Sequence, residues 1–211
     1  MRILLIDDHP LFLAGIRSVL SARAGAVEIF ECTSAAAGER VLAAQPDLDF
    51  ICVDLELPDR DGLSFIADLD RRRLPVPIIV LSAAQAPETV HRALKAGACA
   101  YIAKSTPGEA ILAAFAEIAR TGHYVSPELR APLDAFRAGL HGVATGAVNL
   151  TERQHEVLQL LAHGCNNQEI ASRLAVSVRT VKWHVSSLLA LLDADNRTAC
   201  AARARELGLL D

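Results

Sequence analysis

The sequence predicts an α/β protein with two domains: a doubly wound parallel sheet of five strands, followed by an all-α domain of four helices. Three observations predict this fold. Strand-length apolar runs alternate with helical patterns in the first part of the chain, acidic residues follow the strands, and no strand pattern occurs after residue 148. A chain of 211 residues, 52% hydrophobic and 22% charged, has the length and composition of two small globular domains.

Five βα units account for the first 122 residues. The apolar runs cover residues 3–6, 27–30, 50–53, 78–81 and 100–102, and the helical patterns cover 11–20, 36–42, 63–69, 90–94 and 111–118. Thr106 and Glu109 form a capping-box pattern for the last helix, with Pro107 as its first helical residue. Asp61 stands before Gly62, where we expect it to be the N-cap of the third helix. Repeated βα units imply a sheet covered by helices on both faces.

Polar and charged residues follow four of the five predicted strands. Ligands bind beyond the carboxyl ends of the strands in such sheets, so we expect these side chains to converge there. Two carboxylates about 4 Å apart repel by roughly 4 kcal/mol at an effective dielectric constant near 20, so such a group favours a cation. Glu56 and Asp59 have the simpler interpretation of loop residues in water. The converging residues are Asp7 and Asp8, then Asp54, then Ser82, then Lys104.

Carboxylates, an ammonium and a hydroxyl suit a Mg²⁺ ion that holds a phosphoryl group. Asp54 is the candidate phosphoryl acceptor, because a carboxylate can form an aspartyl phosphate. Asp8, and Asp7 directly or through water, would hold the metal. Lys104 would neutralise phosphoryl charge, and Ser82 would donate a hydrogen bond to a phosphoryl oxygen. The chain has neither GxxxxGK[ST] nor GxGxxG, so we expect another molecule to supply the phosphoryl group.

The stretches "LIDDHP", "VDLELPDRDG", "VLSA" and "YIAKS" resemble the receiver domain of bacterial two-component response regulators over residues 1–122. The resemblance implies a flavodoxin-like sheet and a sensor histidine kinase that phosphorylates Asp54. It implies that Mg²⁺ is bound by Asp7, Asp8, Asp54 and the backbone carbonyl of Glu56. It also implies that Ser82 and Tyr101 shift together on phosphorylation.

Residues 123–147 carry Gly, Pro and Ala with weak periodicity, which indicates a linker with at most one short helix around 133–140. No apolar stretch approaches the roughly 18 residues of a membrane helix, and the first apolar run is too short for a signal peptide. We therefore expect a cytoplasmic protein without a membrane partner. The five cysteines are widely spaced and without a CxxC pair, which is typical of buried reduced thiols.

Residues 148–211 predict four helices. Thr151 to Gln154 and Asn166 to Glu169 are capping boxes of the first two, and Ser177 is the expected cap of the third. Up to Gly122 there are 12 Lys and Arg against 16 Asp and Glu, whereas 7 of each occur from residue 148 onward. Because this second part has no net charge, a nucleic-acid function depends on where its charges lie.

The third helix, residues 177–192, has one apolar stripe, and Trp183 is placed almost opposite to it. Arg179, Lys182 and Ser186 flank Trp183, and no acid occurs between Glu169 and Asp193. A short helix with a basic face, preceded by another short helix and a tight turn, suits the major groove of DNA. A solvated helix face, or a Trp that packs on a partner subunit, is the alternative interpretation. The residues of the apolar stripe are Val178, Val181, Val185, Leu188 and Leu192.

The whole stretch "LTERQHEVLQLLAHGCNNQEIASRLAVSVRTVKWHVSSLLALLDADNRTACAARARELGLL" resembles the LuxR-type helix-turn-helix. The resemblance implies that Thr180, Lys182, Trp183 and Ser186 face DNA and that the last helix, residues 197–207, mediates dimerisation. Two departures from the family predict weaker phosphate contacts: Asp193 replaces the usual Gly and Ala190 replaces a frequent Lys.

Together these features predict a NarL/LuxR-type response regulator with Mg²⁺ as its cofactor. We do not expect it to be an enzyme, except that it catalyses its own phosphorylation and dephosphorylation. Its expected partners are a sensor histidine kinase, promoter DNA, a second copy of the chain when active, and RNA polymerase. One alternative is an aspartyl-phosphate hydrolase, but the DxDx[TV] signature of haloacid dehalogenase-type enzymes would need Asp at position 56. Another is a regulator that ignores phosphorylation and responds to a ligand or partner.

Overall fold

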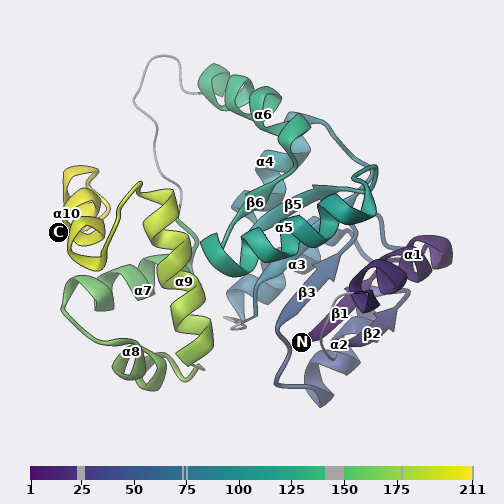
Figure 1. Ribbon diagram of the computed structural model, residues 1–211, viewed down its shortest axis with the longest axis horizontal. Coiled ribbons are helices and arrows are strands. Elements are labelled where there is room, and N and C mark those ends of the chain that lie inside the picture. The colour runs from purple at the N-terminus through teal and green to yellow at the C-terminus, as the bar shows by residue number, and fades with distance from the viewer. Residues whose placement is uncertain (23–26, 73, 75, 141–149, 177, 211) are drawn as a thin grey trace.

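The computed structural model describes residues 1–22, 27–72, 74, 76–140, 150–176 and 178–210. The first domain is a parallel sheet of six strands in the order β2-β1-β3-β4-β5-β6 (Figure 1). The first five strands are the predicted ones, and the sixth adds to the edge beside β5. Their bounds are β1 (Arg2–Ile6), β2 (Glu28–Cys32), β3 (Phe50–Val53), β4 (Ile78–Ser82), β5 (Ala100–Ala103) and β6 (Tyr124–Val125).

Helices cover both faces of this sheet, as the repeated βα units predict. Alternate residues of each strand pack into two different hydrophobic cores, because successive side chains of a strand point to opposite faces of the sheet. One core lies under α2, α3, α4 and α6, and the other under α1 and α5. The helices are α1 (Pro10–Ser21), α2 (Ala35–Ala44), α3 (Gly62–Arg71), α4 (Pro87–Lys95), α5 (Gly108–Thr121) and α6 (Pro127–Leu140).

The capping-box prediction for α5 is wrong. The helix begins at Gly108 with Pro107 as its N-cap, and no side chain caps it. The Thr106 hydroxyl instead lies 3.2 Å from that of Ser126, the residue after β6. The local sequence pattern predicts that the Thr106 hydroxyl caps α5, but this hydroxyl makes a tertiary contact with Ser126 instead.

The expectation of at most one short helix around residues 133–140 is also wrong, because α6 has 14 residues and continues through Pro132. Leu129 and Leu133, one helical turn apart, are buried in the core under α4. The Phe136 ring lies 5.7 Å from that of His91 in α4. Packing against the first domain therefore stabilises a helix in which Pro132 and Gly139 are locally unfavourable.

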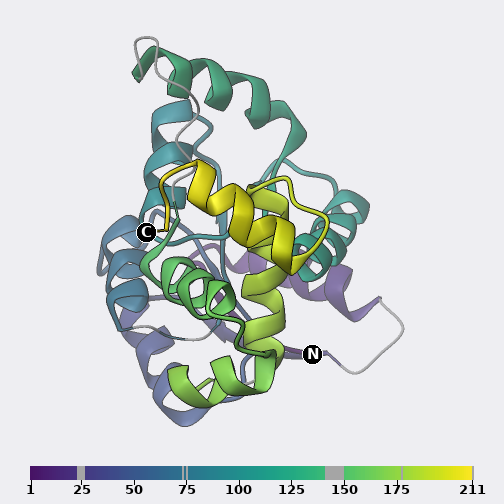
Figure 2. The same cartoon turned by 90° about the vertical axis from the view of Figure 1, so that its left-hand side faces the viewer.

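The second domain contains four helices around a core of its own, as predicted. They are α7 (Glu152–Ala162), α8 (Asn167–Leu174), α9 (Val178–Leu191) and α10 (Arg197–Glu206). Both predicted capping boxes are present, at Thr151 and at Asn166. Ser177, the expected cap of α9, lies outside the described residues. These helices lie to the left of the sheet domain in Figure 1, and Figure 2 shows them from that side, in front of the sheet domain.

Among the described residues, no helix combines the length and the apolar character needed to cross a membrane. All five cysteines are free thiols, and four of them are buried.

Candidate phosphoacceptor site and DNA-binding helix

Asp7 and Asp54 occupy the first positions beyond two neighbouring central strands. The ladder hydrogen bonds continue through both residues, because the Asp7 amide donates to the Cys32 carbonyl at 2.9 Å and the Asp54 amide donates to the Ile6 carbonyl at 2.9 Å. This backbone pairing fixes the two side chains at one edge of the sheet. Both residues are buried, with exposed fractions of 3% and 2%.

Lys104, which follows β5, reaches across this edge to both acids. Its Nζ lies 2.6 Å from Asp54 Oδ2 and 2.8 Å from Asp7 Oδ2. Burial alone would lower the Lys104 pKa, but the hydrogen bonds and charges of Asp54 and Asp7 outweigh it and raise that pKa above its usual value. Lys104 is therefore a fixed positive charge between two buried carboxylates, as the strand-end pattern predicts.

The second Asp54 oxygen, Oδ1, accepts a hydrogen bond from the Leu55 amide at 2.7 Å. Each carboxylate oxygen of Asp54 thus has a donor beside it. These donors compensate the negative charge of the buried carboxylate. Lys104 is also close enough to neutralise charge on a phosphoryl group that Asp54 could accept.

Ser82 and Tyr101 lie on the adjacent strands and meet at Ala84. The Ala84 amide donates to Ser82 Oγ at 3.2 Å, and the Tyr101 hydroxyl donates to the Ala84 carbonyl at 2.5 Å. Both side chains are buried, and burial is the main cause that raises the Tyr101 pKa. The two side chains are therefore linked by hydrogen bonds to the backbone of the same residue, Ala84.

The residues at this edge can also form a cation site. Asp7, Asp8, His9 and Asp54 offer ligand atoms that all lie within 4.8 Å of one another. Carboxylate oxygens are the ligands that Mg²⁺ prefers, so the donor set fits this ion. Glu56 is exposed and pairs with Asp61 in an isolated antiparallel bridge. His9 was missed in the sequence, although it directly follows Asp8 in the same acidic motif.

Two of the neighbouring acids are structural. Asp61 is the N-cap of α3, as predicted, and its side chain accepts from the Ser64 amide. Asp59 is not merely solvated, because its two oxygens accept from the Ala35 and Ala36 amides at 2.9 Å each. The bonds from Ala36 and then Ala35 lower the Asp59 pKa. The acidic loop thus stabilises the first turn of α2 through Asp59, in addition to following Asp54 of the site.

The apolar stripe of α9 is confirmed. Lys182 is exposed, whereas Thr180, Trp183 and Ser186 are half-buried, and the Arg179 side chain lies outside the described residues. Asp193, which follows the helix, has φ 49°, in the left-handed region that Gly tolerates best. This explains why Gly suits the position. The buried stripe residues are Val181, Val185, Leu188 and Leu192.

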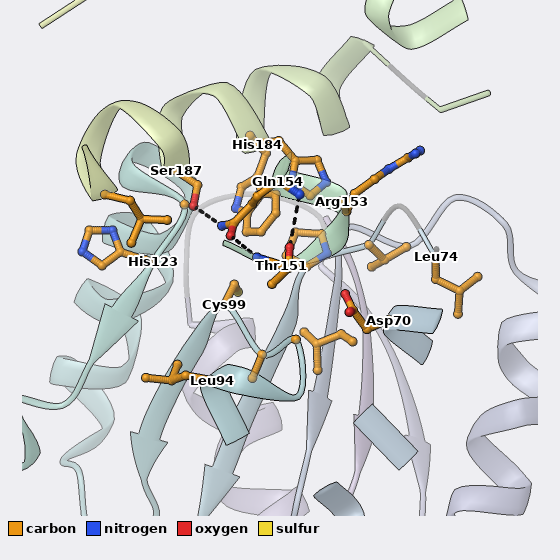
Figure 3. Close-up of a pocket in the computed structure, with 18 of the residues that line it drawn as sticks. Asp70, Leu74, Leu94, Cys99, His123, Thr151, Arg153, Gln154, His184 and Ser187 are labelled. Carbon is orange, nitrogen blue, oxygen red and sulfur yellow. Dashed lines mark hydrogen bonds between the residues drawn. The ribbon is translucent and has the colours of Figure 1, made fainter. Parts of the chain in front are cut away.

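Trp183 points away from this stripe but toward the sheet domain rather than into solvent. It lines a cavity of about 160 Å³ between the two domains, together with Leu94, Cys99 and His123 of the sheet domain. Figure 3 shows this cavity, with Ser187 and Gln154 above the strands and Leu94 and Cys99 below. The indole Nε1 is buried, and the ring lies 4.6 Å from that of His184. Of the residues predicted to contact DNA, Trp183 thus faces the first domain, whereas Lys182 is exposed.

Gly122 lies close to Ser187 of α9 at the contact between the domains. A Cβ built on this residue would lie 2.4 Å from the Ser187 Cβ and 2.8 Å from the Ser187 amide nitrogen, and its φ is 78°. Ser187 is fully buried and its hydroxyl accepts from Gln154 Nε2 at 2.9 Å. Gly122 therefore allows α9 to pack on the end of α5. Neither residue was identified in the sequence, because no local pattern reports a contact between domains.

Two family models match separate parts of the chain. Residues 3–116 match the family described as "Response regulator receiver domain", and residues 148–204 match "Bacterial regulatory proteins, luxR family". The response regulator protein VraR of Staphylococcus aureus (strain Mu3 / ATCC 700698) is 32% identical over 212 residues, covering 100% of this chain and 99% of VraR.

Solved structures of full-length regulators are similar over nearly the whole chain. The response regulator ChrA of a haem-sensing two-component system has a TM-score of 0.50 at 28% identity, covering 99% of this chain and 98% of ChrA. RcsB of Salmonella enterica serovar Typhimurium, bound to the promoter P1flhDC in the presence of the phosphomimetic BeF₃⁻, has a TM-score of 0.60 at 25% identity, covering 96% and 97%. With a buried Asp54 paired to the half-buried Lys104 at the sheet edge, and a helix-turn-helix in the second domain, this chain belongs to the two-component response regulators with a LuxR-type DNA-binding domain.

Proposed function

We propose that a sensor histidine kinase phosphorylates this regulator on Asp54 with Mg²⁺, and that phosphorylation controls its dimerisation and promoter binding in the cytoplasm. The observation that carries the proposal is the Asp54 carboxylate, which is 2% exposed and has Lys104 Nζ at 2.6 Å. Asp7, Asp8, Asp54 and the Glu56 carbonyl would hold the ion, which supplies positive charge next to the phosphoryl oxygens.

The transfer itself needs little from the protein beyond position and charge. A carboxylate oxygen of Asp54 attacks the phosphorus of the kinase phosphohistidine, an O–P bond forms and the N–P bond breaks. The electron pair stays on the imidazole of the kinase. Lys104 exchanges its contact with Asp54 Oδ2 for a phosphoryl oxygen, so its raised pKa keeps it charged throughout.

Ser82 is placed to report the new group. Its hydroxyl would turn to donate to a phosphoryl oxygen and would no longer accept from the Ala84 amide. The Ala84 carbonyl accepts from Tyr101, so a shift of this loop also moves the Tyr101 ring. We infer that this pair carries the signal from the phosphorylation site into α4 and β5.

DNA binding by α9 requires that the helix leave the receiver. Trp183 and Ser187 face the first domain, and major-groove binding needs the Trp183 face free. We infer that phosphorylation favours a state in which this contact is released and two copies pair, with α10 as the dimerisation helix of the DNA-binding domain. Structures of RcsB dimers on DNA support such an assembly. RNA polymerase is a further partner that the regulator would contact at the promoter.

The test is chemical labelling. Treatment with acetyl phosphate or phosphoramidate and Mg²⁺ should add one phosphoryl group, about 80 Da, to the wild-type chain. Asp54→Ala should not gain it. Asp59→Ala is the matched control, because Asp59 is an acid of the same loop that binds α2. Labelling of Asp54→Ala at the wild-type rate would end the assignment. Selection of bound DNA from a random pool, with and without the phosphodonor, then tests the coupling.

A further inference from the structure

The cavity between the two domains gathers buried polar atoms (Figure 3). Four nitrogens of its lining residues are buried and have no hydrogen-bond partner among the described residues. His123 of the first domain contributes Nδ1, and the second domain contributes Arg153 Nε, Trp183 Nε1 and His184 Nδ1. Because buried polar groups are normally hydrogen-bonded, these four nitrogens point to a partner other than the chain itself.

The same nitrogens determine the hydrogen-bonding character of such a partner. The indole N–H of Trp183 and the Nε–H of Arg153 can only donate, so the partner must present an acceptor. Burial, and then the charge of Arg153, lower the His184 pKa to about 3, so this ring is uncharged at neutral pH. Arg153 and His184 are each 6% exposed, which places both side chains away from bulk water.

The charges around the cavity balance one another. The Arg153 guanidinium pairs with Glu156 at 2.8 Å and donates to the Leu174 carbonyl at 2.9 Å. The other charged lining residues, Asp70 and Arg137, have opposite signs. Because burying a charge without a counter-charge is costly, this balance favours an uncharged ligand.

The volume and the apolar walls determine the size of the ligand. The cavity has about 160 Å³, and an apolar cavity of about 150 Å³ holds one benzene molecule. The Trp183 and His184 rings meet edge to face with centroids 4.6 Å apart and form an aromatic wall. A molecule with a single aromatic ring therefore fits. The aliphatic walls are formed by Leu74, Val76, Leu94 and Leu191.

We propose that this cavity binds a small, uncharged aromatic molecule with one hydrogen-bond acceptor, such as a ring nitrogen or a carbonyl, and that the bound molecule holds α9 against the receiver. His123 and Trp183 belong to different domains, so the complete site exists only while the domains are in contact. By linkage, the ligand then stabilises that contact. The binding site is independent of the proposed function, whereas the effect on DNA binding rests on it.

The experiment uses the full chain and two probes of the same shape, pyridine and benzene, of which only pyridine carries an acceptor. Trp183 is the single Trp of the chain, so its indole N–H gives one signal in a ¹H–¹⁵N NMR spectrum. Pyridine should move this signal downfield in a saturable way, because the N–H donates to the ring nitrogen. Trp183→Phe keeps an aromatic ring without the donor. In this variant the ratio of pyridine affinity to benzene affinity, measured by titration of backbone amide signals, should fall about tenfold.

The effect on DNA binding is measured with the unphosphorylated chain and a selected DNA site. Pyridine at ten times its Kd should lower the DNA affinity about tenfold, because a ligand of one state shifts the equilibrium by the factor 1 + [L]/Kd. Gly122→Ala should weaken pyridine binding, since the new methyl group would separate the two walls of the site. Gly164→Ala is the control and should bind pyridine as the wild type does.

The outcomes separate the inference from the proposed function. An unchanged affinity ratio in Trp183→Phe, or an indole signal that does not shift in a saturable way, would overturn the inference and leave water as the occupant of the cavity. The proposed function would stand in that case if Asp54 still accepts a phosphoryl group. Saturable pyridine binding with unchanged DNA affinity would overturn the effect on α9 and would also contradict the release step of the proposed function.

Discussion

The phosphoacceptor edge and the recognition helix α9 differ in what holds them in place. Asp7, Asp54 and Lys104 are fixed by strands of one sheet, whose parallel pairing brings their ends together. The outer face of α9 is fixed by a contact with another domain, at Gly122 and around Trp183. The first arrangement follows from topology, whereas the second can be made and released without unfolding either core. A two-domain switch needs both kinds of region.

The largest expected effect is at the fixed region. Lys104→Met should lower the free energy of unfolding by about 3 kcal/mol in the absence of divalent ions, because two buried carboxylates would lose their cation. Urea denaturation of the full chain measures this. Added Mg²⁺ should restore part of the loss, since the ion replaces the missing charge. Equal stability of variant and wild type without Mg²⁺ would show that the ion pair does not stabilise the edge.

The next largest effect is the pH dependence of stability caused by His184, a buried residue of α9. Burial, and then the charge of Arg153, lower the His184 pKa to about 3. Between about pH 6.5 and pH 3 the unfolded chain binds a proton at this residue and the folded chain does not. Stability should therefore fall by about 1.4 kcal/mol per pH unit as the pH drops below about 6.5.

Urea denaturation at pH 7 and pH 5 measures this dependence. His184→Gln should remove about 2 kcal/mol of the loss between those values. His163→Gln, at an exposed histidine, is the control and should retain it. An unchanged pH dependence in His184→Gln would show that another group causes the loss.

The contact between α9 and the first domain can be tested at Gly122. Gly122→Ala should raise the DNA affinity of the unphosphorylated chain about tenfold, or about 1.4 kcal/mol, because the new methyl group would collide with α9 at Ser187. Gel-shift titration against a selected site measures the change. Gly164→Ala is the matched control, since Gly164 has a similar φ of 82° but no neighbouring atom within 4 Å. A gain in both variants, or in neither, would argue against the contact as the cause.

The smallest effect separates two residues of α9 itself. Lys182 is exposed, and its loss should weaken binding to all DNA sequences alike and reduce the slope of log affinity against log salt by about 1. Trp183→Ala should instead lower the preference for the selected site over a scrambled duplex, with little change in slope. Fluorescence anisotropy at several salt concentrations measures both, with residues 148–211 as the binding fragment. The prediction for Trp183 fails if the ratio of the two affinities is unchanged.

The same contrast explains what could be predicted from the sequence. Strands β1 to β5 and the convergence of Asp7, Asp54 and Lys104 follow from periodicity and the rules of parallel sheets. Helices α7 and α8 follow from their capping boxes. Helix α6 could not be predicted, because Pro132 and Gly139 disfavour a helix locally and burial of Leu129 and Leu133 decides the outcome. Strand β6 has two residues, too few for any periodic signal.

The position of Trp183 shows most clearly what the sequence pattern of one helix cannot predict. Helix geometry places it opposite the buried stripe, and this is correct within its own domain. A single helix cannot indicate whether that outer face meets water, DNA or another domain. His9 was missed for a related reason, since its ring meets the acids only when the start of α1 is packed against the ends of β1 and β3.

Because α6 packs on α4 and in the core of the first domain, the covalent connection to the DNA-binding domain is short. Ten residue steps separate Leu140 from Leu150, so the two ends lie at most about 36 Å apart in any conformation. A DNA-binding domain released from Gly122 therefore remains near the receiver at an effective concentration on the order of millimolar. Contacts that would be too weak to join two separate proteins are sufficient to keep α9 covered. A modest change in the receiver can then uncover it.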